Sequence, residues 1–102
     1  MTEHFNGLTP AEAERLAYLM EEMAEAQQVI GKILRHGPHS YNPIESHPDF
    51  KILNIQLLEK ELNDVLNAIR LMQSSGDLPK LPALPQPDIY PTYRYMHHQE
   101  KP

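Results

Sequence analysis

The sequence predicts an all-α protein in which two long antiparallel helices per chain form a four-helix-type bundle by dimerisation. Two runs without a helix breaker, about residues 10–35 and 49–74, repeat apolar residues at intervals of three and four, as an amphipathic α-helix requires. A loop over 36–48, rich in histidine, glycine and proline, separates them. Each run carries two apolar stripes side by side, which a lone hairpin cannot bury, so we expect a homodimer or a tetramer.

Length and composition limit the classes to which this chain can belong. Its 102 residues suffice for one domain, which we expect to span 1–77 and to be followed by an extended tail over 78–102. The formal net charge of −5 argues against a nucleic-acid surface, because neutralising phosphates needs a basic patch. No apolar run approaches the roughly 18 residues of a membrane span. The absence of cysteine excludes thiolate metal sites and favours a cytoplasmic protein.

The first helix has clear start and stop signals. Thr9 is a good N-cap, Pro10 fits the first helical position, and Glu12 can reach back to complete a capping box. Gly37 suits a C-cap. One apolar stripe consists of Leu16, Met20, Met23, Ile30 and Leu34. Beside it runs a second stripe of Leu19, Ala26, Val29 and Ile33, with Glu22 inside it.

The second helix has the strongest periodicity in the chain. A second capping box, Ser46 to Asp49, stands before it, and Ser74 to Asp77 ends it. Its first stripe reads Ile55, Leu58, Leu62, Val65, Ile69 and Met72. The stripe one position earlier reads Asn54, Leu57, Glu61, Asp64, Ala68 and Leu71, so an acidic pair interrupts a core-facing stripe. We expect the methionines of both helices, Met20, Met23 and Met72, to belong to the core.

The tail over 78–102 differs in composition from the helices. Prolines at 79, 82, 85, 87 and 91 predict an extended, polyproline-like chain. Leucine, isoleucine and tyrosine residues alternate with them, which a freely solvated linker would not need. We therefore expect much of the tail to pack against the helices or against a partner subunit.

Two pairs of acidic residues interrupt the helices near their centres. Glu22 and Glu25 stand three residues apart and so share a helix face, as do Glu61 and Asp64. If the helices lie side by side, four carboxylates converge, and burying them unpaired is costly. A divalent cation would make such a cluster tolerable. A solvated acidic face is the simpler alternative, but the inward position of the stripes disfavours it.

These residues also resemble a known signature. Glu21-Glu22-x-x-Glu25 followed by Glu61-x-x-Asp64 resembles the EExxE…ExxD pattern of the all-α nucleoside triphosphate pyrophosphohydrolases, the MazG-like superfamily. The basic end of the first helix, from Lys32 to Gly37, resembles short, often phage-borne members. The resemblance covers roughly residues 12–73. Asn63 departs from the family's usual glycine, and the gap between the two motifs is longer than is typical.

The resemblance implies Mg²⁺-dependent hydrolysis of a (d)NTP to the (d)NMP and pyrophosphate, with Mn²⁺ as a possible substitute. The implied metal ligands are Glu22, Glu25, Glu61 and Asp64. Glu21 completes the implied catalytic set, as a further ligand, a proton acceptor or a surface neighbour. The residues we expect to bind substrate are Lys32, Arg35, Asn54 and Asn67, with Tyr41, His36 and His39 on the loop able to close over it. The pattern does not indicate which base or sugar is preferred.

Other interpretations remain open. The chain could bind nucleotide or metal with little or no turnover, or it could be a structural helical protein whose proline-rich tail is recognised by a partner. A di-iron carboxylate bundle is disfavoured, because no glutamate is followed by histidine three residues later. His36, His39 and His47 match no standard zinc spacing.

Overall fold

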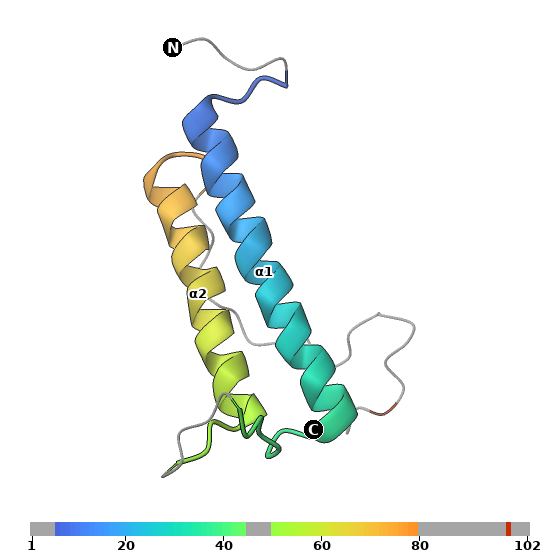
Figure 1. Cartoon of the computed structure of the whole chain (residues 1–102). Coiled ribbons are helices and arrows are strands. Elements are labelled where there is room, and N and C mark those ends of the chain that lie inside the picture. The colour runs from blue at the N-terminus through green and yellow to red at the C-terminus, as the bar shows by residue number, and fades with distance from the viewer. Residues whose placement is uncertain (1–5, 45–49, 80–97, 99–102) are drawn as a thin grey trace.

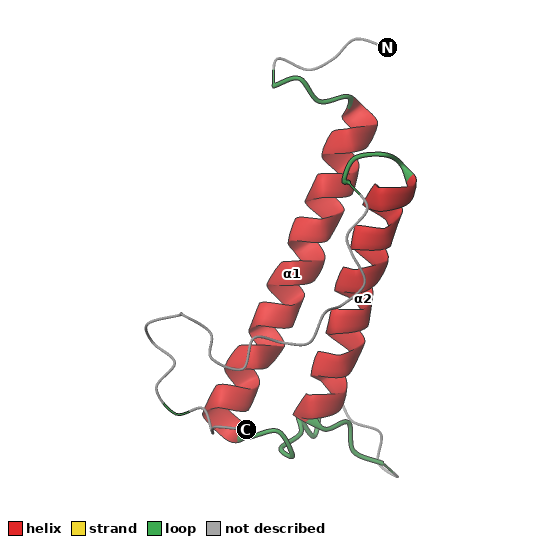
Figure 2. Ribbon diagram, turned by 180° about the vertical axis from the view of Figure 1, so that it is seen from behind, coloured by secondary structure: helices red, strands yellow, loops and turns green. Residues whose placement is uncertain are grey.

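The part of the chain that the structure describes is a helical hairpin. The computed structural model describes residues 6–44, 50–79 and 98. These residues form α1 (Pro10–His36) and α2 (Asn54–Ser74), which run antiparallel and side by side, as Figures 1 and 2 show from opposite faces. The predicted all-α class with two long helices is therefore confirmed for this part of the chain. The predicted tail lies outside the described residues except at its first two positions and at 98.

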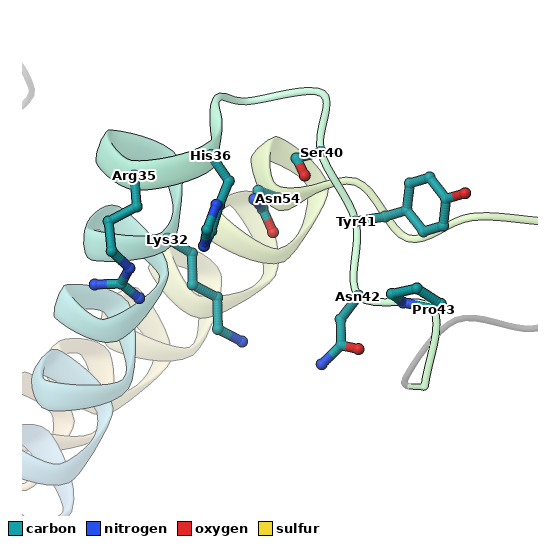
Figure 3. A pocket seen from close by; sticks show the side chains of 8 residues that line it. All are labelled: Lys32, Arg35, His36, Ser40, Tyr41, Asn42, Pro43 and Asn54. Atoms are coloured by element: carbon teal, nitrogen blue, oxygen red, sulfur yellow. The ribbon is translucent and has the colours of Figure 1, made fainter.

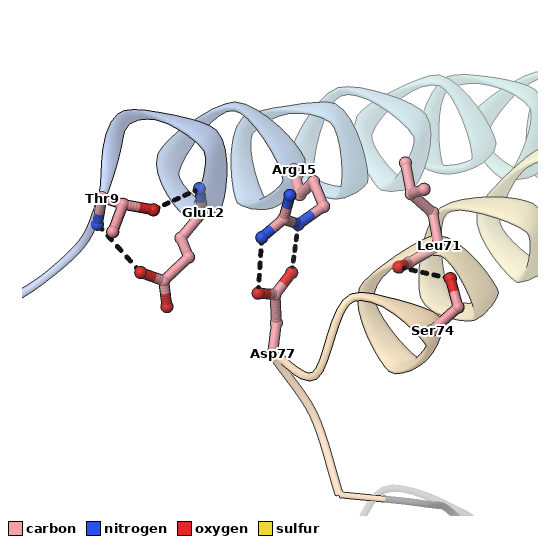
Figure 4. A network of polar contacts seen from close by, with 6 residues as sticks. All are labelled: Thr9, Glu12, Arg15, Leu71, Ser74 and Asp77. Carbon is pink, nitrogen blue, oxygen red and sulfur yellow. Dashed lines mark hydrogen bonds and ion pairs between the residues drawn. The ribbon is translucent and has the colours of Figure 1, made fainter. Parts of the chain in front are cut away.

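The start of α1 follows from its sequence. The Thr9 hydroxyl accepts a hydrogen bond from the Glu12 backbone N–H at 3.2 Å, and the Thr9 backbone N–H donates to the Glu12 carboxylate at 2.9 Å (Figure 4). This capping box satisfies two N–H groups that the helix itself leaves without partners. At the other end Gly37 adopts a φ of 88°, which favours glycine, and its N–H donates to the Ile33 carbonyl at 2.7 Å.

The second helix begins at Asn54, later than the expected start near residue 49. Hydrogen bonds to the loop account for the later start. The N–H group of Asn54 donates to the Ser40 carbonyl and that of Ile55 to the Pro38 carbonyl, both at 2.9 Å. Tyr41 and Leu53 form an isolated antiparallel bridge, which keeps the chain extended up to the helix. The capping box expected at 46–49 lies outside the described residues.

The core is a thin seam between the two helices. Its buried apolar residues in the described part of the chain are Ala26, Val29, Ala68 and Met72. The two alanines allow the backbones to approach closely, and Met72, only 2% exposed, fills the remaining space. The expectation that Met72 belongs to the core is confirmed.

One of the two stripes of α1 is exposed in the part of the chain that the structure describes. It is the stripe expected to be apolar core, Leu16, Met20, Met23, Ile30 and Leu34, and all five of its residues are exposed. Leu34 is 82% exposed, and Met20 and Met23 therefore do not belong to the core of one chain. Such an apolar strip on a surface is typical of an interaction face. No helix in the described ranges is both long and apolar enough to cross a membrane.

An ion pair joins the start of α1 to the end of α2, at the end of the hairpin opposite the connecting loop. The Arg15 guanidinium donates from Nε to Asp77 Oδ2 at 2.5 Å and from Nη2 to Oδ1 at 2.8 Å (Figure 4). The Asp77 N–H donates to the Met72 carbonyl at 2.9 Å. Two parallel hydrogen bonds hold the carboxylate in one orientation, so the pair ties the end of α2 to an early turn of α1.

Asp77→Asn is expected to lower the thermal unfolding midpoint at about pH 7, and the difference from the unchanged protein should disappear in acid. The Arg15 guanidinium lowers the pKa of Asp77 in the folded state. The stabilisation is therefore complete above the ordinary pKa of aspartate, about 3.9, and is lost as pH falls through the lower folded value. Circular dichroism melts from about pH 7 to about pH 2.5 measure this. A difference that stays constant over the whole range would contradict the role of the ion pair.

Candidate metal centre and adjoining pocket

Three carboxylates from the two helices meet near the middle of the hairpin. Glu22 of α1 and Glu61 and Asp64 of α2 place carboxylate oxygens within 4.8 Å of one another. All three side chains are partly buried. The separation suits a single cation shared by oxygen ligands from both helices, and we call these three residues the acidic triad.

Two oxygens of the acidic triad lack partners. Oε2 of Glu22 and Oε2 of Glu61 are buried, and neither has a hydrogen-bond partner within the described part of the chain. Buried carboxylate oxygens without partners are costly and rare. Hard oxygen ligands with unfilled bonding capacity are what Mg²⁺ prefers, together with substrate oxygens. The residues present therefore fit a divalent cation.

Glu25 joins the acidic triad through its charge. The negative charge of Glu22 raises the pKa of Glu25, and burial and the charge of Glu61 add to the effect. Glu25 stands outside the group whose oxygens lie within 4.8 Å. The charges of the predicted carboxylates thus influence one another: Glu22, Glu61 and Asp64 place oxygens within 4.8 Å of one another, and Glu25 lies beside them.

Two predicted site residues lie apart from this cluster. Glu21 is exposed on α1, as expected from the rotation of about 100° between successive residues of a helix. Asn67 is exposed on α2, and it does not line the pocket that other predicted substrate residues form. The structure therefore places neither of them in direct contact with the acidic triad.

Lys60 is a neighbour of the acidic triad that the sequence patterns did not single out. Its ammonium group lies 3.2 Å from Asp64 Oδ2 and 3.5 Å from Glu61 Oε1. The signal was present in the sequence, since residues four apart on a helix face each other. Lys60 thus supplies a positive charge beside two of the three carboxylates.

A polar pocket opens where the hairpin connects its helices. Its volume is about 330 Å³, and it lies between the last turns of α1, the loop and the first residue of α2 (Figure 3). Three of the four residues expected to bind substrate, Lys32, Arg35 and Asn54, line it, as do His36 and Tyr41. The remaining lining residues are Ser40, Asn42 and Pro43, which the sequence patterns did not single out. His39 does not line the pocket.

Asn54 also has a structural role in this pocket. It is only 4% exposed, and its side-chain Nδ2 donates to the Gly37 carbonyl at 3.2 Å. Its amide nitrogen therefore holds the loop against the start of α2. The centroid of the Tyr41 ring, which also lines the pocket, lies 4.8 Å from the Lys51 ammonium group. This cation–π contact helps to fix the position of the ring.

On each helix, one pocket residue shares a face with one of the predicted carboxylates. Seven residues separate Glu25 from Lys32 on α1, and seven separate Asn54 from Glu61 on α2. Seven residues are nearly two helical turns, so each pair projects from the same side with an axial separation of about 10 Å. A ligand of that length could touch both the carboxylates and the pocket that contains Lys32 and Arg35.

No family model, curated protein or solved structure matches this chain.

Proposed function

We propose that the protein is a Mg²⁺-dependent nucleoside triphosphate pyrophosphohydrolase, which converts a (d)NTP to the (d)NMP and pyrophosphate. The observation that carries the proposal is the pair of buried oxygens, Oε2 of Glu22 on α1 and Oε2 of Glu61 on α2, neither of which has a hydrogen-bond partner among the described residues. The pocket that contains Lys32 and Arg35, about 10 Å away along the helices, supplies the second requirement of a phosphorylated substrate.

In this proposal Glu22, Glu61 and Asp64 hold the metal directly, and Glu25 adds negative charge from the edge. Mg²⁺, or Mn²⁺ in its place, supplies positive charge that neutralises phosphate oxygens and favours ionisation of the attacking water. The water oxygen bonds to the α-phosphorus, the bond from that phosphorus to the α–β bridging oxygen breaks, and pyrophosphate leaves. Solvent, or a carboxylate that does not hold the metal directly (Glu25 or Glu21), takes the proton.

The pocket would hold the rest of the substrate. Lys32 and Arg35 are the groups that suit phosphate oxygens. Asn54 and Tyr41 offer an amide oxygen and an aromatic face to the nucleoside. Asn67 would reach the substrate only from a position outside this pocket, so its assignment is the least supported by the geometry.

We also assign the exposed stripe of α1 to a second copy of the chain. Leu16, Met20 and Met23 line an apolar hollow of about 440 Å³ that nothing in the described ranges covers. A homodimer, or a tetramer made of two such pairs, would bury this face and build the four-helix arrangement that the stripes predict. Sedimentation velocity of the full chain measures the state directly.

The function is tested by following pyrophosphate and monophosphate together across canonical and chemically modified (d)NTPs. With Mg²⁺ or Mn²⁺ present, at least one nucleotide is expected to yield the two products in equal amounts. Chelation of the metal should stop the reaction, and Glu61→Gln serves as the site-specific control. Release of inorganic phosphate alone, or no product from any nucleotide in the panel, contradicts the assignment.

A binding module with weak or no turnover is the second candidate. Lys60 neutralises part of the acidic triad, and the amide nitrogen of Asn54 is occupied by the loop. Both features would reduce catalysis without preventing nucleotide binding. Calorimetry that shows tight nucleotide binding, in a sample that forms no product, would favour this candidate.

A further inference from the structure

The acidic triad has a cation of its own. Lys60 lies on α2 one residue before Glu61, and its ammonium group contacts both Asp64 at 3.2 Å and Glu61 at 3.5 Å. It therefore touches two of the three carboxylates that would hold a metal. The third, Glu22, keeps a buried oxygen without a partner in the described residues. One ammonium thus neutralises the cluster incompletely.

The positions of these side chains allow the ammonium group to leave. The Lys60 side chain is 66% exposed, whereas that of Glu61 is 14% exposed. Lysine carries its charge on a flexible chain of four carbons, and an exposed ion pair of this kind is weak. The Lys60 ammonium group therefore lies on the solvent side of the less exposed carboxylates, and it can move into solvent with little loss of free energy.

We propose that Lys60 is an internal counter-ion that competes with the divalent metal for Glu61 and Asp64 and so lowers the metal affinity of the site. This inference rests on the proposed function and specifies how its metal site is tuned. A cation held by the acidic triad would lie within a few ångströms of the ammonium group, and like charges at that distance repel. Metal binding must therefore displace Lys60, and the displacement weakens binding.

Competition between Lys60 and the metal has an effect on metal affinity that a purely structural lysine would not have. Removing the ammonium removes both the competition and the repulsion, so metal should bind more tightly. At the effective dielectric of a site near the protein surface, we expect a gain of about threefold to tenfold in affinity. A lysine that only supported the helix would leave the metal affinity unchanged.

The experiment titrates the full chain with Mn²⁺ in the absence of nucleotide and measures free Mn²⁺ by electron paramagnetic resonance. Lys60→Gln is compared with the unchanged protein, with Lys60→Arg, which keeps the charge, and with Lys51→Gln. Lys51 is an exposed lysine of the segment before α2, and its replacement makes the same change in net charge away from the acidic triad. Circular dichroism verifies that every variant keeps its helices.

The expected result is a Kd for Mn²⁺ about threefold to tenfold lower in Lys60→Gln, with both comparison variants close to the unchanged protein. The inference would also be supported if Lys60→Gln bound Mn²⁺ and the three other proteins did not. An unchanged or higher Kd in Lys60→Gln, while the unchanged protein binds, overturns the inference and leaves the metal site in place. An equal gain in Lys51→Gln overturns it too, since net charge would then be the cause. Absence of binding in every variant overturns both the inference and the metal site.

Discussion

Glu22→Gln is expected to raise the thermal unfolding midpoint of the metal-free protein while reducing pyrophosphate release by about 100-fold or more. Glu22 has a buried oxygen without a partner among the described residues, and its charge is the main cause of the raised pKa of Glu25. The neutral amide has nearly the same shape, so the substitution removes repulsion without creating a cavity. The same substitution removes a metal ligand, and the stabilisation that Mg²⁺ gives the unchanged protein should disappear with it.

The pH dependence of this gain has a definite sign. Because the folded-state pKa of Glu25 is raised, the repulsion costs stability above the ordinary pKa of glutamate, about 4.3, and vanishes once the carboxylates are protonated. Glu22→Gln should therefore be more stable than the unchanged protein at neutral pH and equal to it in strong acid.

Thermal melts with and without Mg²⁺, together with product release, measure all three effects. Glu59→Gln is the matched control, because Glu59 is an exposed glutamate of α2 outside the acidic triad. It should change neither stability nor activity. A Glu22→Gln protein that is less stable than the unchanged protein and fully active would show that Glu22 has a structural role. A gain in stability with loss of activity is the pattern expected of a functional residue.

Met72→Ala is expected to lower the free energy of unfolding by about 2–5 kcal/mol. Met72 is the largest fully buried side chain in the described part of the chain, and the alanines around the seam leave few neighbours that could fill the space it vacates. Small domains are stable by only about 5–15 kcal/mol, so the variant should approach the limit of folding.

Denaturant unfolding followed by helical circular dichroism measures the loss. Ile44→Ala is the control, because Ile44 is 93% exposed in the loop and its truncation should change stability by less than about 0.5 kcal/mol. Equal losses in the two variants would contradict the position of the core between the helices.

The sequence by itself determined the two helices and the inward position of the acidic residues. Thr9, Pro10 and Glu12 define the start of α1 by local hydrogen bonding and backbone geometry, which depend on neighbours in the chain. Glu61 and Asp64 interrupt a periodic apolar stripe, and periodicity indicates which residues share a face. Lys32, Arg35 and Asn54 were expected to act together, and they line one pocket.

Only the tertiary structure decided which of the two stripes on α1 packs against α2, because both are apolar and each could bury the same kind of surface. It also decided the start of α2, where the carbonyls of Ser40 and Pro38 replace a side-chain cap. The pairing of Arg15 with Asp77 joins positions far apart in the chain, which no local pattern specifies. The acidic triad depends in the same way on tertiary structure, because α1 supplies Glu22 and α2 supplies Glu61 and Asp64.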